Sequence, residues 1–269
     1  MAVKSPTDDP NYVAPDQVQE LGGDLKLLTF PGGFGFYAHS SIEESTLIYN
    51  EVFVKEEYLS GDASLEGCRC VFDVGANIGL FTVFAKTRNP DLVVHAFEPI
   101  GPTYDVLLKN IELHGLNGVH AHNFALGNQD GSERQITFYP HAAGNSTSSP
   151  ESKEDLKRTL TEMIGAEKTA YLFGSPQVHT VRSRTLSAVL DEEGIAAVDL
   201  LKMDAEGDEL AVLQGIRDEH FPGIRQIAAE IHGGALLDAI RPLLAGKGYR
   251  VSFDDGLTGE NNTNLFAIR

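Results

Sequence analysis

The sequence predicts an α/β fold in which helices cover both faces of a mostly parallel sheet. One observation is that residues 68–86 read as a buried strand, a tight glycine turn and the first turns of a helix, because an apolar run is followed by Phe81 and Phe84 at helical spacing. The other is that strands and helices alternate after this segment. Such alternation indicates parallel strands joined by right-handed helical crossovers.

Residues 1–67 are expected to form an N-terminal tail, a hairpin and a helical cap. The expected elements are a loosely held tail over residues 1–20, strands 25–30 and 34–39 joined through Pro31-Gly32-Gly33, and a helix over 41–59 that starts at a capping serine. We expect this unit to lie across the first strand of the sheet, where an acceptor molecule enters.

Residues 68–269 are expected to form the ligand-binding domain. The expected strands are 69–74, 92–97, 119–125, 133–139, 177–182, 198–203, 224–231, 249–254 and 263–268, and the expected helices are 78–88, 102–114, 185–194, 204–216 and 235–246. The last two strands are close enough in sequence to pair as an antiparallel hairpin. Residues 148–176, which contain a polar helical segment, interrupt the alternation and are interpreted as an insertion that covers the pocket or forms a dimer contact.

The glycine turn between Asp73 and Gly79 indicates the type of ligand. A dinucleotide site needs the pattern G-x-G-x-x-G, which exposes backbone amides to a pyrophosphate, whereas this chain has G-x-x-x-G. Asp73 ahead of the turn would repel a pyrophosphate, so a nicotinamide-dependent dehydrogenase is disfavoured. A cationic ligand without phosphate is favoured, and S-adenosylmethionine, with its sulfonium and ammonium groups, fits this description.

A second acidic residue supports a nucleoside ligand. Glu98 follows the apolar strand 93–97 and lies roughly twenty residues beyond the glycine turn, the distance at which an acid at the end of the second strand binds ribose hydroxyls. The alternative is that Glu98 is an exposed acid at a strand end, followed by Pro99.

Composition restricts the possible partners. The 269-residue chain carries 39 acidic and 21 basic residues, and its net charge of −18 disfavours a nucleic-acid substrate. No apolar run approaches the ~18 residues of a membrane-spanning helix, and the N-terminus lacks the apolar core of a signal peptide, so we expect a cytoplasmic protein. Cys68 and Cys70 are interpreted as buried thiols.

The order of motifs resembles the FkbM family of class I S-adenosylmethionine-dependent methyltransferases. The motifs are FDVGANIGLFT, FEP, NFALGNQDG, RTLSAVL and LLKMDAEGDELAVLQG. The resemblance implies a Rossmann-like, seven-stranded, mostly parallel sheet with an antiparallel terminal hairpin. It implies a cofactor loop of Asp73, Gly75, Ala76, Asn77 and Gly79, with Glu98 on the ribose, Phe124 and Ala125 beside the adenine, and Asp204 facing the methionine moiety or the transferred methyl group.

Methyl transfer to an alcohol needs a base, whereas transfer to a carboxylate does not. A base with a pKa near 7 contributes about 10²–10⁴-fold. His232 is the leading candidate because it shares a strand face with Glu230 near the pocket mouth, although it is equally well interpreted as a structural histidine. Glu230, His232 and His179 are the expected acceptor-binding residues, Asp204 is a second catalytic candidate, and His141 is a weaker one.

A metal ion is not expected. Donor groups for a divalent ion are present in Asp204, Glu206, Asp208, Glu230 and His232. The acids at 206–209 are already explained as helix N-terminal residues.

The predicted function is S-adenosylmethionine-dependent O-methylation, with S-adenosylhomocysteine as the product. The acceptor is expected to be a small molecule carrying a hydroxyl or carboxyl group, such as a natural product or a sugar. The alternative is a cofactor-binding or scaffolding protein with the same fold and no activity. A homodimer is possible, and no membrane partner is expected.

Overall fold

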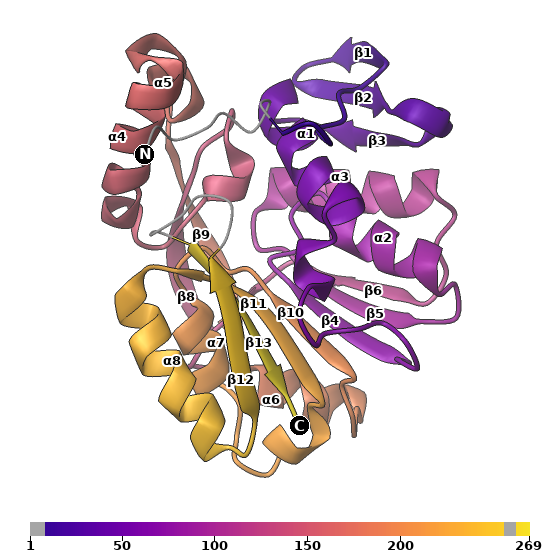
Figure 1. Ribbon diagram of the computed structural model, residues 1–269, viewed down its shortest axis with the longest axis vertical. Helices are drawn as coiled ribbons and strands as arrows, with labels where there is room; N and C mark the ends of the chain where they lie inside the picture. The colour runs from indigo at the N-terminus through magenta and orange to yellow at the C-terminus, as the bar shows by residue number, and fades with distance from the viewer. Residues whose placement is uncertain (1–8, 256–261) are drawn as a thin grey trace.

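A seven-stranded sheet forms the centre of the molecule (Figure 1). The computed structural model describes residues 9–255 and 262–269. In spatial order the strands are β12 (Arg250–Asp255), β13 (Asn262–Ile268), β11 (Gln226–His232), β10 (Leu200–Met203), β4 (Cys70–Val74), β5 (Val93–Phe97) and β6 (Val119–His122). The mostly parallel seven-stranded sheet expected from the sequence is therefore confirmed.

The final hairpin is inserted into the sheet edge. β13 pairs antiparallel with both β11 and β12, while the five strands from β11 to β6 pair parallel with their neighbours. The expected antiparallel pair is confirmed. The last strand of the chain, β13, lies between β12 and β11, so β12 forms the edge of the sheet. The connection between the two strands, residues 256–261, lies outside the described residues.

Helices cover both faces of the sheet, as predicted (Figure 1). The helices that follow the sheet strands are α2 (Leu80–Arg88), α3 (Gly101–Leu113), α6 (Leu186–Glu193), α7 (Glu209–Gln214) and α8 (Gly234–Gly246), and a 3-10 turn spans Phe221–Gly223. Residues of α6, α7 and α8 pack with Phe72 and Met203 on one face, and residues of α2 pack with Val71 and Leu200 on the other. Alternate residues of each strand therefore enter two separate cores.

A second sheet replaces the last part of one predicted strand. Residues 119–125 were expected to be continuous, but β6 ends at His122 and the chain passes into β7 (Ala125–Leu126), β8 (Ser132–Phe138) and β9 (Gln177–Arg184). These strands form a separate sheet in the order β7-β9-β8. At the break, Asn123 Nδ2 donates hydrogen bonds to the Glu98 and Pro99 carbonyl oxygens, which ties the chain to the loop after β5.

The N-terminal unit has three strands. β1 (Gln17–Gly22) pairs with β2 (Leu25–Thr29), which pairs with β3 (Gly35–Ala38) through a 3-10 turn at Pro31–Gly33. The hairpin is confirmed, but the expectation of a loosely held tail is wrong from Gln17 onward, because β1 gains ladder hydrogen bonds. Residues 1–8 lie outside the described residues.

A capped helix follows the hairpin. α1 (Ile42–Tyr49) begins at Ser41, whose hydroxyl accepts a hydrogen bond from the backbone N–H of Glu44, as predicted. The predicted helix over 41–59 is not continuous: it changes to a π-helical turn at Asn50–Val54 and ends in a 3-10 turn at Glu57–Leu59.

The segment interpreted as an insertion is helical. It contains a 3-10 turn at Pro150–Lys153 and the helices α4 (Glu154–Ile164) and α5 (Ala166–Leu172), and another 3-10 turn, Ala143–Asn145, precedes it. In Figure 1 these helices lie at the upper left and the N-terminal strands at the upper right, with the central sheet below both. Within the described ranges, the structure contains no helix with the length and apolar character needed to cross a membrane.

Candidate active site

A cavity of about 1630 Å³ lies at the carboxyl ends of the central strands. Its lining includes Val74, Glu98, Asp204 and Glu230, which lie at or next to the ends of four neighbouring strands. Open α/β sheets bind ligands at this edge. Sites for one small molecule measure about 300–1,000 Å³, so this cavity has room for two. A smaller cavity of about 330 Å³ lies at the opposite edge of the sheet, near Val198 and Ile224.

The cavity collects most, but not all, of the predicted site residues. Those that line it are Gly75, Ala76, Asn77, Glu98, Phe124, Ala125, Asp204 and Glu230. Among the described residues, the predicted ones that do not line it are Asp73, Gly79, His141, His179 and His232.

The two glycines of the turn make room for protein atoms. Gly75 has φ +70°, and a Cβ there would lie 1.7 Å from the Asp204 carbonyl oxygen. Gly79 has φ +87°, and a Cβ there would lie 2.4 Å from Leu107 Cδ1. The sequence-based interpretation was close approach to a ligand. Gly75 instead needs glycine because the Asp204 backbone comes too near, and Gly79 is favoured by its positive φ, since Leu107 Cδ1 is the end of a flexible side chain. Asn77, between them, also has positive φ, at 49°.

Asp73 is buried under the turn and paired with a lysine. Its Oδ2 accepts a hydrogen bond from Thr82 Oγ1 at 2.7 Å, and its Oδ1 lies 3.2 Å from Lys202 Nζ. Burial opposes the charge on Lys202, but the carboxylates, Asp73 foremost, outweigh it and raise the pKa of the lysine. The negative charge of Asp73 is therefore compensated within the protein, so it neither repels a pyrophosphate nor attracts a cation as the sequence argument assumed.

The lining of the cavity is nevertheless strongly acidic. Ten acidic side chains line it, against four basic ones. The acids are Asp9, Glu43, Glu44, Glu51, Glu98, Asp155, Asp204, Glu206, Asp208 and Glu230, and the bases are Lys55, Arg158, Lys168 and Lys202. Burial raises the pKa of Glu44, Glu51, Glu98 and Glu230, so these four carry less than a full negative charge at neutral pH. The other six acids still outnumber the four bases, which favours a cationic ligand over a polyphosphate.

Glu98 is held by the backbone at the end of β5. Its Oε2 accepts from the N–H of Asn77 at 3.0 Å and its Oε1 from the N–H of Ile100 at 2.8 Å. Burial raises the pKa of Glu98 to about 7, against the effect of these two hydrogen bonds. With an exposure of 7%, Glu98 is not the exposed strand-end acid of the alternative interpretation. Each carboxylate oxygen keeps acceptor capacity toward the cavity.

His232 lies among carboxylates behind the cavity surface. Its Nδ1 is 3.0 Å from Glu209 Oε1, and its Nε2 is 3.2 Å from Glu206 Oε2. Burial lowers the pKa of His232, but Glu206, Glu209 and Glu230 together outweigh it and raise the pKa to about 10. The ring is therefore an imidazolium at neutral pH, which does not favour the predicted role as a base.

Glu230 presents a carboxyl group to the cavity two residues earlier in β11. Its Oε1 accepts a hydrogen bond from Asn262 Nδ2 in β13. Burial and then the charge of Asp204 raise the pKa of Glu230 to about 8. A carboxyl group with a pKa in this range exchanges protons near neutral pH, which a general base must do.

Asp204 follows β10 and has one oxygen available. Its Oδ2 accepts a hydrogen bond from Tyr58 Oη at 2.9 Å. Its Oδ1 is buried and accepts no hydrogen bond from any residue that the structure describes. A buried oxygen of this kind takes a hydrogen bond from a water molecule or from a donor on a ligand.

Asp204, Glu230 and His232 place donor atoms within 4.8 Å of one another, a separation suited to a divalent ion. The Nδ1 of His232 already faces Glu209 and its Nε2 already faces Glu206, so an ion would have to displace the second contact. The imidazolium supplies positive charge at the same place.

The remaining predicted histidines lie outside the cavity. His179 is in β9, with its ring edge against Phe138 at 5.4 Å and its Nε2 3.4 Å from Gln177 Oε1. The His141 ring stacks on the Tyr171 ring, with centroids 4.2 Å apart. Tyr171 lines the cavity, but His141 does not. Neither placement brings an imidazole to the expected acceptor.

The sequence interpretation missed four lining residues that surround Asp204 and Glu230: Glu51, Tyr58, Lys202 and Asn262. Lys202 had a detectable signal, because a lysine inside the apolar strand LLKM requires a buried partner. Glu51 and Tyr58 lie in the irregular turns after α1, where no periodicity identifies the inward face.

Comparisons with known proteins place the chain among methyltransferases. Residues 73–251 match the sequence model of the Methyltransferase FkbM domain. The 31-O-demethyl-FK506 methyltransferase FkbM of Streptomyces tacrolimicus is 37% identical over 238 residues, which cover 84% of this chain and 90% of that protein. Methyltransferase sdnD of Sordaria araneosa is 35% identical over 229 residues, covering 81% and 87%. The N-terminal domain of human METTL16, solved in complex with SAH, is 12% identical with a TM-score of 0.44, covering 85% and 71%.

Proposed function

The chain belongs to the FkbM methyltransferase family, and from its cavity we propose that it is an S-adenosylmethionine-dependent O-methyltransferase of a small hydroxylated molecule. The observation that carries this proposal is the pair Asp204 and Glu230 at the ends of adjacent strands. Both line one cavity of about 1630 Å³, which has room for a cofactor and an acceptor together.

The residues of the cavity fit the cofactor. When bound, S-adenosylmethionine supplies a methyl group on a positively charged sulfonium. The backbone of Gly75, Ala76 and Asn77 and the carboxylate of Glu98 would hold the nucleoside, with Phe124 beside the adenine. The excess of acidic side chains in the lining favours the cation electrostatically.

Glu230, rather than His232, is the proposed base. Its carboxylate lines the cavity and is oriented by Asn262, so it is placed to take the proton of an acceptor hydroxyl. His232 holds Glu206 and Glu209 in position as an imidazolium. The free Oδ1 of Asp204 would accept a hydrogen bond from the acceptor or the cofactor.

The charge of the cavity also selects between hydroxyl and carboxyl acceptors. A carboxylate acceptor needs no base, but it would enter beside the carboxylate of Asp204, where like charges repel. A neutral hydroxyl avoids this cost and makes use of the base. We therefore favour an alcohol or phenol.

Helices α4 and α5 are proposed to cover the acceptor. Their apolar residues Leu156, Leu160, Met163 and Leu172 line the cavity. An acceptor with an apolar body fits this wall, and the net charge of −18 disfavours a nucleic acid.

The test is transfer of a labelled methyl group to a panel of hydroxylated and carboxylated compounds. The wild type is compared with Glu230→Gln and with Glu162→Gln, a control at an exposed position of α4 outside the cavity lining. We expect transfer to hydroxyl acceptors by the wild type and the control only. Cofactor binding without transfer to any acceptor would favour the inactive scaffolding alternative.

A further inference from the structure

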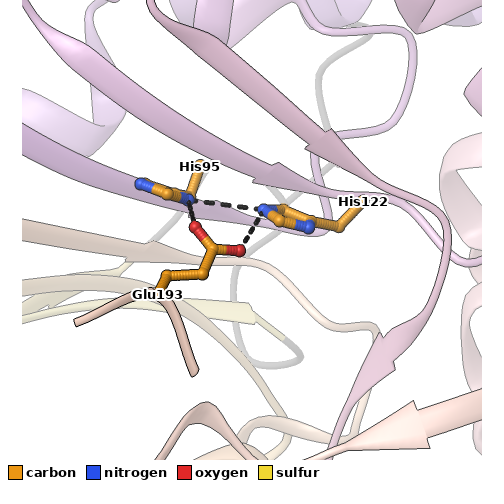
Figure 2. Close-up of side chains that lie close together, drawn as sticks. All are labelled: His95, His122 and Glu193. Atoms are coloured by element: carbon orange, nitrogen blue, oxygen red, sulfur yellow. Dashed lines mark hydrogen bonds and ion pairs between the residues drawn. The ribbon is translucent and has the colours of Figure 1, made fainter. Parts of the chain in front are cut away.

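Two histidines and a glutamate meet on the other side of the cavity floor. His95 in β5 and His122 in β6 lie on the sheet face covered by α6, and Glu193 is the last residue of that helix (Figure 2). In the parallel register, His95 lies opposite His120, and Phe97 lies opposite His122. The two histidines are therefore diagonal neighbours on one face.

The three side chains converge on one point. His95 Nδ1 lies 3.3 Å from His122 Nε2 and 3.2 Å from Glu193 Oε2, and His122 Nε2 lies 3.6 Å from Glu193 Oε1 (Figure 2). Zinc binds imidazole nitrogen at about 2.0–2.1 Å and carboxylate oxygen at about 2.0–2.2 Å, so two ligands in a tetrahedral site are separated by about 3.3–3.5 Å. The separations from His95 Nδ1 to His122 Nε2 and to Glu193 Oε2 match this spacing. Glu193 faces His122 with its other oxygen, Oε1, so the carboxylate has to turn for one oxygen to complete the face of the tetrahedron.

The cluster is buried at His95 and open to solvent at Glu193. The His95 side chain is 4% exposed, while those of His122 and Glu193 are 15% and 30% exposed. An ion can enter from the Glu193 side, and a water molecule can take the fourth position. His120 stacks parallel to His95 at 4.7 Å and is exposed, so it is not aimed at the same point.

We propose that His95, His122 and Glu193 bind one zinc ion, with water as the fourth ligand. The site would tie the end of α6 to β5 and β6. None of its three ligands lines the cavity, so the ion would not contact the reacting groups of the proposed methyl transfer.

A bound ion would also stabilise the cavity floor. The His122 ring stacks on Phe97 at 4.7 Å and lies 5.3 Å from Phe124, and both phenylalanines line the cavity. Fixing His122 therefore fixes the surface against which the adenine is proposed to lie.

The test uses cobalt as a spectroscopic substitute for zinc. Protein freed of metal with a chelator is titrated with Co²⁺, and we expect the visible absorption of four-coordinate cobalt at one ion per chain, abolished by Zn²⁺. His122→Ala and Glu193→Gln should each weaken cobalt binding by at least about 10-fold, since loss of even an outer-shell partner costs 10–100-fold. His120→Ala should retain the absorption, as should Glu230→Gln, which removes a donor from the Asp204 cluster.

Stability provides a second measurement. Zinc should raise the melting temperature of the wild type and of His120→Ala, and should leave those of the two ligand variants unchanged. Melting without metal shows that the variants fold. Absence of four-coordinate cobalt in the wild type, or absorption that survives both ligand substitutions, would overturn the proposal; a cluster held only by a shared proton gives the first of these results.

Discussion

Replacement of Glu230 by glutamine removes the proposed base while keeping its shape. The amide of glutamine still offers an oxygen to Asn262 Nδ2, so the contact with β13 is retained. It cannot take a proton from an acceptor hydroxyl. We expect the rate of methyl transfer to an alcohol to fall by about 10²–10⁴-fold, the usual contribution of a positioned base.

The pH dependence gives a sharper prediction. Because the pKa of Glu230 is raised to about 8, the base form predominates only above that pH. The wild-type rate should therefore fall about tenfold for each pH unit below 8, so that roughly one-hundredth remains at pH 6. The variant, which has no group to titrate at this position, should show a flat profile over the same range.

The assay is single-turnover transfer of labelled methyl between pH 6 and 9, with cofactor affinity measured in parallel. We expect cofactor affinity to change little. The reasoning about Glu230 is refuted if the variant keeps the wild-type rate or the same pH profile on an alcohol, because the proton would then leave by another route.

Three further predictions concern stability. In thermal unfolding, Gly75→Ala should destabilise the fold by clearly more than Gly67→Ala. Both positions have positive φ, which costs alanine about 1–2 kcal/mol, but only the Cβ at position 75 would lie 1.7 Å from a carbonyl oxygen. Equal losses of stability would contradict the close approach. Lys202→Met should lower the free energy of unfolding by about 3–5 kcal/mol, measured with denaturant, because it leaves the Asp73 carboxylate buried without its partner. Adding Asp73→Asn should restore most of this stability. No recovery would argue against the ion pair. His232→Gln should cost a similar ~3–5 kcal/mol at pH 6. A histidine whose folded pKa is raised from 6.5 to about 10 contributes stability that is complete below pH 6.5 and is lost as the pH rises through 10. The difference in unfolding free energy between wild type and variant should therefore shrink from pH 6.5 to pH 10. A difference independent of pH would contradict the imidazolium.

The sheet was predictable because each of its strands has a recognisable local sequence pattern. Apolar runs such as those of β4 and β10 are flanked by glycine or acidic residues, and the helices between them have their own spacing. Which sheet a short strand joins is a different matter. At the break after His122, the Asn123 side chain bonds to carbonyls of the neighbouring loop, a contact between residues about 25 positions apart that no local pattern indicates.

The sequence predicted where the acidic residues of the candidate site lie, but not which of its side chains are charged. Strand ends place Glu98, Asp204 and Glu230 together, because parallel strands share one edge. The partners of these acids come from distant segments: Tyr58 reaches Asp204 across 146 positions, and His232 meets Glu209 across 23. Electrostatic environment depends on such contacts, which explains why the surroundings of Asp73 and His232 differ from those expected.

Isothermal titration calorimetry with S-adenosylmethionine tests the central claim most directly, with NAD⁺ as the matched control. The acidic cavity and the glycine turn predict binding of one molecule of S-adenosylmethionine per chain and no detectable heat with the pyrophosphate coenzyme. Heat with NAD⁺ and none with S-adenosylmethionine, or none with either, would contradict the account.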